Sequence, residues 1–418
     1  MKKVLFTVAL MFGAMAASAQ VSVVKEAKSM MKKDPAAAAQ KIEAALTNPE
    51  TANDPNTWQL AGDIQKAIYD AENDKIYMAQ LGQGEAADMP KMYGALVKMY
   101  EYYSKCDDVE QAGIANGTVK KAKLRKKNAE LLLNVRGNLG NAGSDAFNEG
   151  KYEDAKNYFG LYVDVAEFPM FADKAAELKA DTVNTLFANY ATMAAAFCEP
   201  KDVAAIIKYG NIGKENPSEG HRALSFLAEV YGKEQVDSVK WLEVINEGLQ
   251  KFPEQDFFVG NIMDYYLQKG QVDQALAQID KSLAVNEKSY YLYVKGVLLY
   301  EKKDYAGAHA ALDKVIAKNE GDTPETSLVA EAYAKKGDIH FFPAQMIVEE
   351  NSTLNIDDPK YNVNEAKIKE AYELAKPFYE KAKELEPDNK AIWGQQLLRV
   401  YWALNKAEYE ALEKEMGY

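Results

Sequence analysis

The residues that most often bind metals or act as nucleophiles are few in this chain. The three histidines are His221, His309 and His340. None lies at metal-site spacing from another histidine or a cysteine, so we predict no metal site. We expect His309 to lie on the flank of a helix. Cys106 and Cys198 are 92 residues apart, and this spacing leaves open whether they form a disulfide or remain buried thiols.

Nucleotide-binding motifs are equally scarce. The chain has no Gly-Lys-Ser/Thr phosphate loop and no calcium loop of alternating carboxylates. Gly137, Gly140 and Gly143 form a loose G-x-x-G-x-x-G series, but they lie inside a helical pattern with no strand before it. Close helix packing explains these glycines better than a dinucleotide site does. We therefore predict that no cofactor is bound.

Paired carboxylates occur at Asp107-Asp108 and at Asp357-Asp358, and we assign both pairs to turns. A glycosidase needs two carboxylates held across a cleft, and adjacency in the sequence does not provide that geometry. We predict that the protein is not an enzyme. The alternative within the enzyme class is a hydrolase that uses carboxylates in a groove.

One run of positive charge stands out in an otherwise acidic chain. It consists of Lys120, Lys121, Lys123, Arg125, Lys126 and Lys127. The run is either the solvated start of a helix, with charges on every side, or a patch for an anionic partner. Lipid headgroups and an acidic protein are examples of such an anionic partner.

Apolar and small residues recur at helical spacing, which indicates the elements that must position any site. Leu139, Ala142, Gly143 and Ala146 follow an i, i+3, i+4, i+7 pattern, which marks one face of a helix. Gly150 interrupts this helix, and Ala155 and Phe159 then mark the inner face of a second helix. Pro169 closes the unit because proline cannot continue a helix. The unit is predicted to be a helical hairpin.

This hairpin pattern repeats along the chain. Trp241, Ala275 and Ala308 occupy equivalent places in successive second helices, at intervals of 34 and 33 residues. The pattern resembles the tetratricopeptide repeat (TPR), a helix pair of about 34 residues. The resemblance implies an all-α superhelical solenoid of about eight or nine hairpins, because no single hairpin buries its apolar face alone. The expected hairpins span residues 21–47, 57–106, 122–166, 172–215, 220–252, 255–284, 289–318, 325–385 and 389–416.

The repeats differ in regularity. Residues 20–170 hold irregular repeats, residues 220–318 the most regular ones, and residues 369–418 the C-terminal ones. Residues 337–368 are an insertion, which either forms a long loop or extends the flanking helices.

The first 19 residues have the features of a secretory signal peptide. Lys2 and Lys3 precede an apolar stretch that ends in the small residues Ala17-Ser18-Ala19, so cleavage is expected after Ala19. The residue directly after the cleavage site is Gln20 and not a cysteine, so we expect no lipid anchor. The mature chain loses two of 50 basic residues against 63 acidic ones, and its net charge becomes −15. Such a charge disfavours nucleic acid as a partner. The Ala-Ser-Ala-Gln ending resembles signals of Bacteroidetes, which implies a periplasmic protein.

The TPR resemblance also implies where a partner binds. TPR proteins bind peptides on a concave groove lined by the first helix of each hairpin. In that register the groove residues are Phe257, Asp264, Tyr290, Tyr293 and Tyr300. The tyrosines either face a ligand or contact the neighbouring hairpin. We predict a non-catalytic scaffold for a protein or peptide of the cell envelope. The alternative is a glycan-binding helical-repeat protein of the outer-membrane uptake machinery.

Two short segments indicate a modification. Asp181-Thr182-Val183 and Asp237-Ser238-Val239 resemble the O-glycosylation signal of Bacteroidetes, which has an acidic residue, a hydroxyl and an apolar residue. The resemblance implies glycans on Thr182 and Ser238, in exposed turns.

Overall fold

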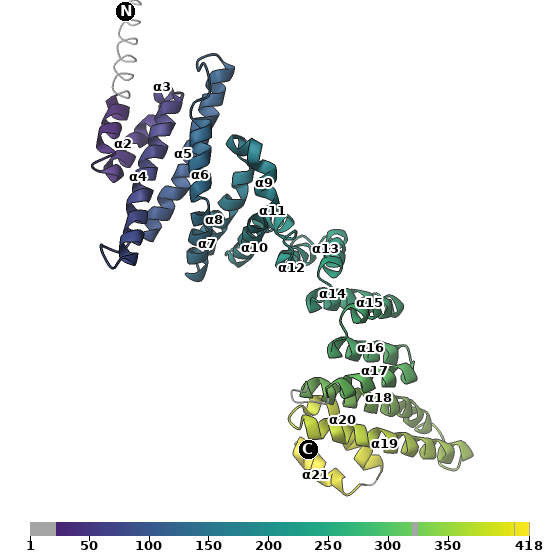
Figure 1. Ribbon diagram of the computed structural model, residues 1–418. Coiled ribbons are helices and arrows are strands. Elements are labelled where there is room, and N and C mark those ends of the chain that lie inside the picture. The colour runs from purple at the N-terminus through teal and green to yellow at the C-terminus, as the bar shows by residue number, and fades with distance from the viewer. Residues whose placement is uncertain (1–21, 320–324, 405, 418) are drawn as a thin grey trace, which may run out of the picture. The chain divides into compact units, whose positions relative to one another are not determined.

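The computed structural model describes residues 22–319, 325–404 and 406–417, and every regular element among them is a helix (Figure 1). The prediction of an all-α fold of helical hairpins is confirmed. The chain divides into two compact units, Met1–Trp241 and Leu242–Tyr418. The expected signal peptide, residues 1–19, lies outside the described residues.

The first unit opens with helical residues 22–30. Its further helices are α2 (Pro35–Leu46), α3 (Pro49–Ala52), α4 (Pro55–Gln80), α5 (Met89–Ala115), α6 (Arg125–Val135), α7 (Gly137–Asn148), α8 (Tyr152–Asp164), the 3-10 turns η1 (Val165–Glu167) and η2 (Pro169–Lys174), α9 (Ala175–Ala180), α10 (Thr182–Phe197), α11 (Val203–Gly213), α12 (Gly220–Glu229) and the π-helical turn η3 (Val230–Glu234). The next helix, α13 (Ser238–Lys251), crosses the boundary between the units.

The second unit continues with helical hairpins. Its helices are α14 (Asp256–Gln268), α15 (Val272–Val285), α16 (Ser289–Glu301), α17 (Tyr305–Lys318), α18 (Thr326–Asn351), α19 (Pro359–Leu385), α20 (Lys390–Ala403) and α21 (Glu408–Met416).

Several helices begin where an aspartate precedes a proline. The carboxylates of Asp34, Asp54 and Asp358 each accept a hydrogen bond from a backbone N–H of the first turn, at 2.8–2.9 Å. The proline that follows each of them occupies the first helical position, where its missing N–H costs nothing. These helix starts are therefore encoded locally.

The two helices of a hairpin pack closely because a glycine of one faces a large side chain of the other. A Cβ atom at Gly143 of α7 would lie 2.5 Å from the ring of Phe159 of α8. At Gly296 of α16 it would lie 2.8 Å from Leu312 of α17. The sequence pattern placed Gly143 and Phe159 on the two helices of one hairpin, and the packing explains why the small residue is needed.

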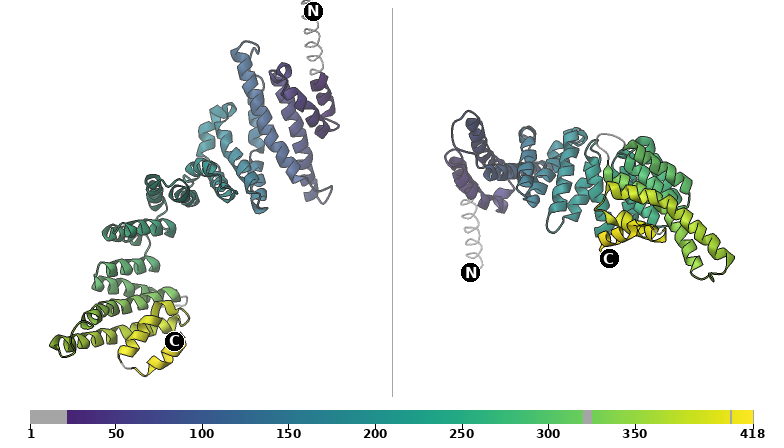
Figure 2. Two further views of the ribbon diagram at one scale, coloured as in Figure 1. Left: turned by 180° about the vertical axis from the view of Figure 1, so that it is seen from behind. Right: turned by 90° about the horizontal axis from the view of Figure 1, so that it is seen from below.

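The inserted residues 337–368 lengthen two helices instead of forming a long loop. Helix α18 continues through Pro343 to Asn351, and α19 begins at Pro359 (Figure 2). The hydroxyl of Tyr379 in α19 donates to Asp338 in α18 at 2.8 Å, and both residues are buried. The second of the two alternatives left open by the sequence is therefore the observed one.

Among the described residues, no helix combines the length and the apolar composition that crossing a bilayer demands.

Candidate functional site

Three surfaces are candidates for binding, and we call the first the first-helix face. It comprises Phe257 and Asp264 of α14 and Tyr290, Tyr293 and Tyr300 of α16. Phe257 is 42% exposed, Tyr290 is 46% exposed, and Asp264 is also exposed. Large exposed aromatic rings on neighbouring hairpins are available to a partner.

Tyr293 and Tyr300 lie differently from the other three residues. Both are half-buried and pack against the apolar core that α16 shares with α17 and α18. Burial raises the pKa of Tyr293, and its hydrogen bond with Glu331 of α18 raises it further. The ammonium of Lys335 lies 5.1 Å from the ring centre of Tyr300. These two tyrosines thus contact the neighbouring hairpin, which was the alternative to a ligand-facing role.

The first-helix face is negatively charged around its exposed ring. Burial raises the pKa of Tyr290, and the nearby carboxylates of Asp264, Asp256 and Glu331 raise it further. Asp256 forms an ion pair with Lys288 at 2.9 Å. Within the described part of the chain, Asp264 and Glu331 form no ion pair. The sequence alone did not identify Glu331, because it lies 41 residues beyond Tyr290.

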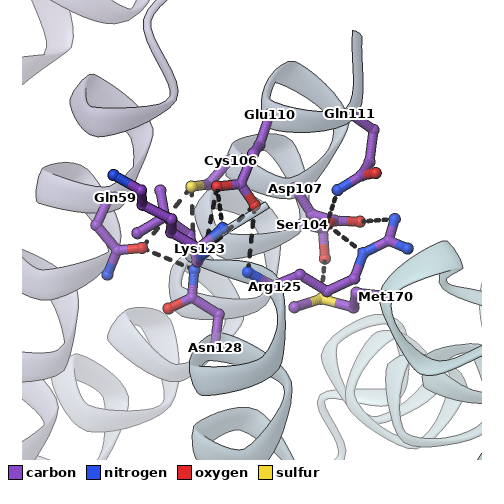
Figure 3. Close-up of polar contacts among 11 residues, drawn as sticks. Gln59, Ser104, Cys106, Asp107, Glu110, Gln111, Lys123, Arg125, Asn128 and Met170 are labelled. Carbon is purple, nitrogen blue, oxygen red and sulfur yellow. Dashed lines mark hydrogen bonds and ion pairs between the residues drawn. The ribbon is translucent and has the colours of Figure 1, made fainter. Parts of the chain in front are cut away.

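The second surface is the lysine segment, residues 120–127, and buried carboxylates hold its backbone (Figure 3). Arg125 donates to Asp107 of α5 through Nε at 2.6 Å and through Nη2 at 2.8 Å. The carboxylate of Glu110 accepts the backbone N–H groups of Lys123, Leu124 and Arg125, the shortest bond being 2.8 Å. Asp107 and Glu110 are each only 2% exposed. The carboxylate of Glu110 thereby caps the N-terminus of α6.

This arrangement corrects two expectations. Asp107 and Asp108 lie inside helix α5 and not in a turn, since α5 continues to Ala115. The positive charges do not surround one helix, because only Arg125, Lys126 and Lys127 belong to α6. Arg125 has a structural role within the lysine segment, since its guanidinium is held by Asp107.

The lysines of the segment remain at the surface. Lys120, Lys121, Lys123 and Lys127 are exposed and form no ion pair within the described residues. Lys126 lies 4.0 Å from Glu130, and its side chain is 90% exposed. The segment therefore presents positive charge at the surface, on a backbone that Glu110 holds at residues 123–125.

The third surface is a hollow at the tips of two hairpins, which we call the turn hollow. It has a volume of about 890 Å³ and is lined by residues 150–154, 156 and 197–203. Phe197 at the end of α10 is 45% exposed, and its ring centre lies 5.3 Å from that of Tyr152 at the start of α8. No spacing in the sequence pointed to this site, because its two sides are more than 40 residues apart.

A buried lysine of α8, Lys156, forms an ion pair across the turn hollow. Lys156 is 9% exposed, and its ammonium lies 2.7 Å from Glu153 and 2.8 Å from Asp202. Burial by itself lowers the pKa of Lys156, but the hydrogen bonds with Asp202 and Glu153 outweigh it and raise the pKa. The thiol of Cys198 donates to Glu153 at 3.4 Å.

Neither cysteine is activated as a nucleophile. Both are free thiols and both are buried, so the question that the sequence left open is answered. Burial raises the pKa of Cys106 to about 12, and the carboxylates of Glu110 and Asp107 contribute. Burial also raises the pKa of Cys198, with a further contribution from Glu153. A protonated thiol is a poor nucleophile.

Two histidines meet in the second unit. The ring centres of His309 and His340 are 5.3 Å apart, and the ring of Phe378 lies beside both. Burial lowers the pKa of both rings, and Lys336 lowers it further. Among the described residues, no three or more His, Cys, Asp or Glu side chains gather as metal ligands would.

The two expected modification sites occupy equivalent places. Thr182 and Ser238 are exposed, and each is the first residue of a helix. The aspartate before each one caps that helix, since Asp181 accepts from Val183 N–H and Asp237 accepts from Lys240 N–H.

The chain was compared with known proteins. No family model matches it, and no curated protein does. Among the solved structures, a TPR repeats protein from Bacteroides fragilis matches at 15% identity and a TM-score of 0.31, covering 64% of this chain and 98% of its own. The P58(IPK) TPR domain matches at 12% identity and a TM-score of 0.26, and the match covers 95% of this chain and 99% of that domain. Yeast Tom70 matches at 11% identity and a TM-score of 0.29, and the match covers 95% of this chain and 91% of Tom70. On the evidence of its own helix pairs and their small-to-large packing, the chain has a TPR-like fold of helical hairpins.

Proposed function

We propose that this protein is a non-catalytic scaffold that binds a protein or peptide partner through the first-helix face. The observation that carries the proposal is the exposure of Phe257 and Tyr290 on the first helices of two successive hairpins. Aromatic side chains offer a large contact area with few rotatable bonds to freeze, and binding hot spots are enriched in tyrosine.

The charge beside these rings supports a partner segment that carries basic residues. Asp264 and Glu331 lie near Tyr290 and have no ion-pair partner among the described residues. A lysine or arginine of the partner would meet the face of the Tyr290 ring and a carboxylate together. We therefore propose a basic peptide segment as the ligand.

Site-specific crosslinking tests this proposal. The substitutions Phe257→benzoylphenylalanine and Tyr290→benzoylphenylalanine place a photoreactive ring on each first helix. The matched control is Val285→benzoylphenylalanine, at an exposed position on the second helix α15. We expect the same envelope protein to crosslink at positions 257 and 290 and not at 285. Equal crosslinking at all three positions, or none at 257 and 290, would refute the proposal.

We further propose that the protein is exported to the periplasm and cleaved after Ala19. The support is the charged start, the apolar stretch and the Ala17-Ser18-Ala19 exit. N-terminal sequencing of the protein from its native host should begin at Gln20. Recovery of an intact Met1 terminus from the cytoplasm would contradict this.

Glycosylation of Thr182 and Ser238 is a separate proposal. Both hydroxyls belong to exposed residues next to an aspartate and a valine. The intact mass of the native protein should exceed that of the bare polypeptide from Gln20 onwards, and Thr182→Ala and Ser238→Ala should remove the excess. A native mass equal to the bare polypeptide would eliminate the proposal.

A further inference from the structure

We infer that the turn hollow of the first unit binds a short neutral oligosaccharide. This inference is independent of the first-helix face, since it concerns other residues, another unit of the chain and another class of ligand. It starts from the combination of an exposed aromatic wall with a set of charged side chains of both signs.

The aromatic wall belongs to a cluster of four rings. The ring centre of Phe197 lies 5.3 Å from Tyr152, 6.0 Å from Phe147 and 6.3 Å from Phe226. Despite these contacts, 45% of Phe197 is exposed, and both Phe197 and Tyr152 line the hollow. Three ring neighbours hold Phe197 in place, so a ligand that stacks on it does not have to order it.

The remaining lining is mainly charged but almost balanced in sign. Seven of the 13 lining residues are charged, three lysines against four carboxylates, so their net charge is −1. A ligand with a large net charge gains nothing from such a lining, and the carboxylates repel phosphate groups. Five of the seven charged residues already form ion pairs within the chain, but an apolar peptide side chain would leave the carboxylates of Asp154 and Glu199 without a partner.

A sugar ring matches both features of the hollow. Its C–H face carries partial positive charge and can lie against the electron-rich face of an aromatic ring. Its hydroxyls both donate and accept hydrogen bonds, so neighbouring carboxylates and ammonium groups can serve the same ligand. Asp154 and Glu199 are exposed and form no ion pair within the described residues, which leaves their carboxylates available to hydroxyl groups.

The hollow is also prepared for a ligand in shape and in rigidity. Its volume of about 890 Å³ lies within the range of roughly 300–1,000 Å³ that is usual for small-molecule sites. Lys156 connects Glu153 on one turn with Asp202 on the other, and Asp202 also accepts the backbone N–H of Ala205 at 3.0 Å. These bonds fix the distance between the two walls before any ligand arrives.

Binding to the full mature chain can be measured by calorimetry and saturation-transfer NMR. The probes are short neutral gluco-, manno-, galacto- and xylo-oligosaccharides. We expect at least one to bind and Phe197→Ala to weaken it by about tenfold or more. The double variant Asp154→Asn, Glu199→Gln should also weaken it. The matched control is Phe342→Ala on α18, an aromatic residue that is 42% exposed and lies in the second unit.

Each outcome of this experiment decides the inference. It falls if none of the saccharides binds, or if binding is unchanged in Phe197→Ala. It also falls if Phe197→Ala abolishes binding of a peptide while no saccharide binds, because the hollow then serves a protein partner. Crosslinking at position 290 should be unaffected by Phe197→Ala, so the scaffold proposal and the saccharide site fail or survive separately.

Discussion

Asp107 of α5 and Arg125 of α6 form a two-point ion pair, with Nε donating to Oδ1 at 2.6 Å and Nη2 to Oδ2 at 2.8 Å (Figure 3). The carboxylate is 2% exposed, whereas the Arg125 side chain is 35% exposed. This pair fixes one residue of the lysine segment to the body of the first unit, and the neighbouring Glu110 fixes the backbone of two more.

Replacing Asp107 should therefore destabilise the first unit and loosen the lysine segment. We expect Asp107→Asn to lower the free energy of unfolding by roughly 2–3 kcal/mol, less than for a fully buried pair because Arg125 is partly solvated. Hydrogen exchange at the amides of residues 123–125 should accelerate. Asp108→Asn, the same change at the exposed neighbour, is the control and should alter neither quantity. Equal effects of the two substitutions would contradict a structural role for the Asp107–Arg125 ion pair.

The four unpaired lysines of this segment should be dispensable for folding and required for anion binding. We expect Lys120, Lys121, Lys123 and Lys127 changed together to glutamine to leave the melting temperature almost unaltered. Binding to vesicles of anionic lipid should weaken by up to about 1 kcal/mol per lysine and should also fall with added salt.

A control for charge alone uses lysines that form ion pairs in the second unit. Lys295, Lys302 and Lys318 pair with Asp280, Asp273 and Glu287. Their replacement by glutamine should change vesicle binding less per charge. If vesicles do not bind but an acidic polypeptide does, the partner is a protein; if neither binds, the segment is a solvated surface.

Glu72 should make the stability of the first unit depend on acid pH. Burial raises its pKa, but hydrogen bonds from Lys91, the Asp88 N–H and Lys75 outweigh this and lower the pKa to about 2. A carboxyl with a folded-state pKa below its unfolded value near 4.5 contributes stability above that value. The contribution is lost as the pH falls from about 4.5 towards 2.

We expect Glu72→Gln to be less stable than the wild type at pH 7, and the difference to shrink over this acid range. Denaturant titrations at several pH values measure it. The control is Asp74→Asn, which removes an exposed carboxylate of the same helix α4 that forms no ion pair among the described residues, so it should cost little stability at pH 7. A Glu72→Gln difference that does not vary with pH would contradict the linkage.

The glycine series of α7 provides a test of close helix packing. A Cβ atom would lie 2.2 Å from Phe187 at Gly140 and 2.5 Å from Phe159 at Gly143, but would meet nothing within 4 Å at Gly137. We expect Gly140→Ala and Gly143→Ala to destabilise the first unit by roughly 1–3 kcal/mol each. Gly137→Ala should be neutral or stabilise by up to about 1 kcal/mol, since alanine favours the helix. An equal change in stability at all three positions would show that contact with Phe187 and Phe159 is not the cause of the destabilisation.

Among the aromatic residues of the first-helix face, some substitutions should reduce mainly the stability of the protein and others mainly the binding of the partner. We expect Tyr293→Ala to cost roughly 2–3 kcal/mol of unfolding free energy, because the side chain packs on the core beside Glu331. Phe257→Ala and Tyr290→Ala should cost less unfolding free energy than Tyr293→Ala, about 1 kcal/mol, because the two side chains are 42% and 46% exposed. Both substitutions should weaken binding of the partner. Chemical denaturation and partner binding measured on the same variants test this. A large stability loss in Tyr290→Ala would place that ring in the core.

The hairpins were predictable because each one is built from residues close in the sequence. The Gly143–Phe159 and Gly296–Leu312 contacts lie within single repeats, so a helical period of small and large residues reveals them. The aspartate–proline helix starts are likewise local. The tyrosine series of α16 was visible by its spacing, but spacing could not separate the exposed Tyr290 from Tyr293, because the choice depends on where α18 lies.

The sequence by itself determined that the chain folds into helical hairpins and that six of its 50 basic residues lie within residues 120–127. Only the tertiary structure decided that Arg125 is bound to Asp107, that Tyr293 contacts Glu331, and that the turns bearing Tyr152 and Phe197 enclose a hollow. The physical reason is the separation along the sequence of the residues that each feature requires. Helix formation and hairpin packing follow from periods of a few residues, whereas a site depends on the stacking of whole hairpins, which brings together side chains from separate repeats.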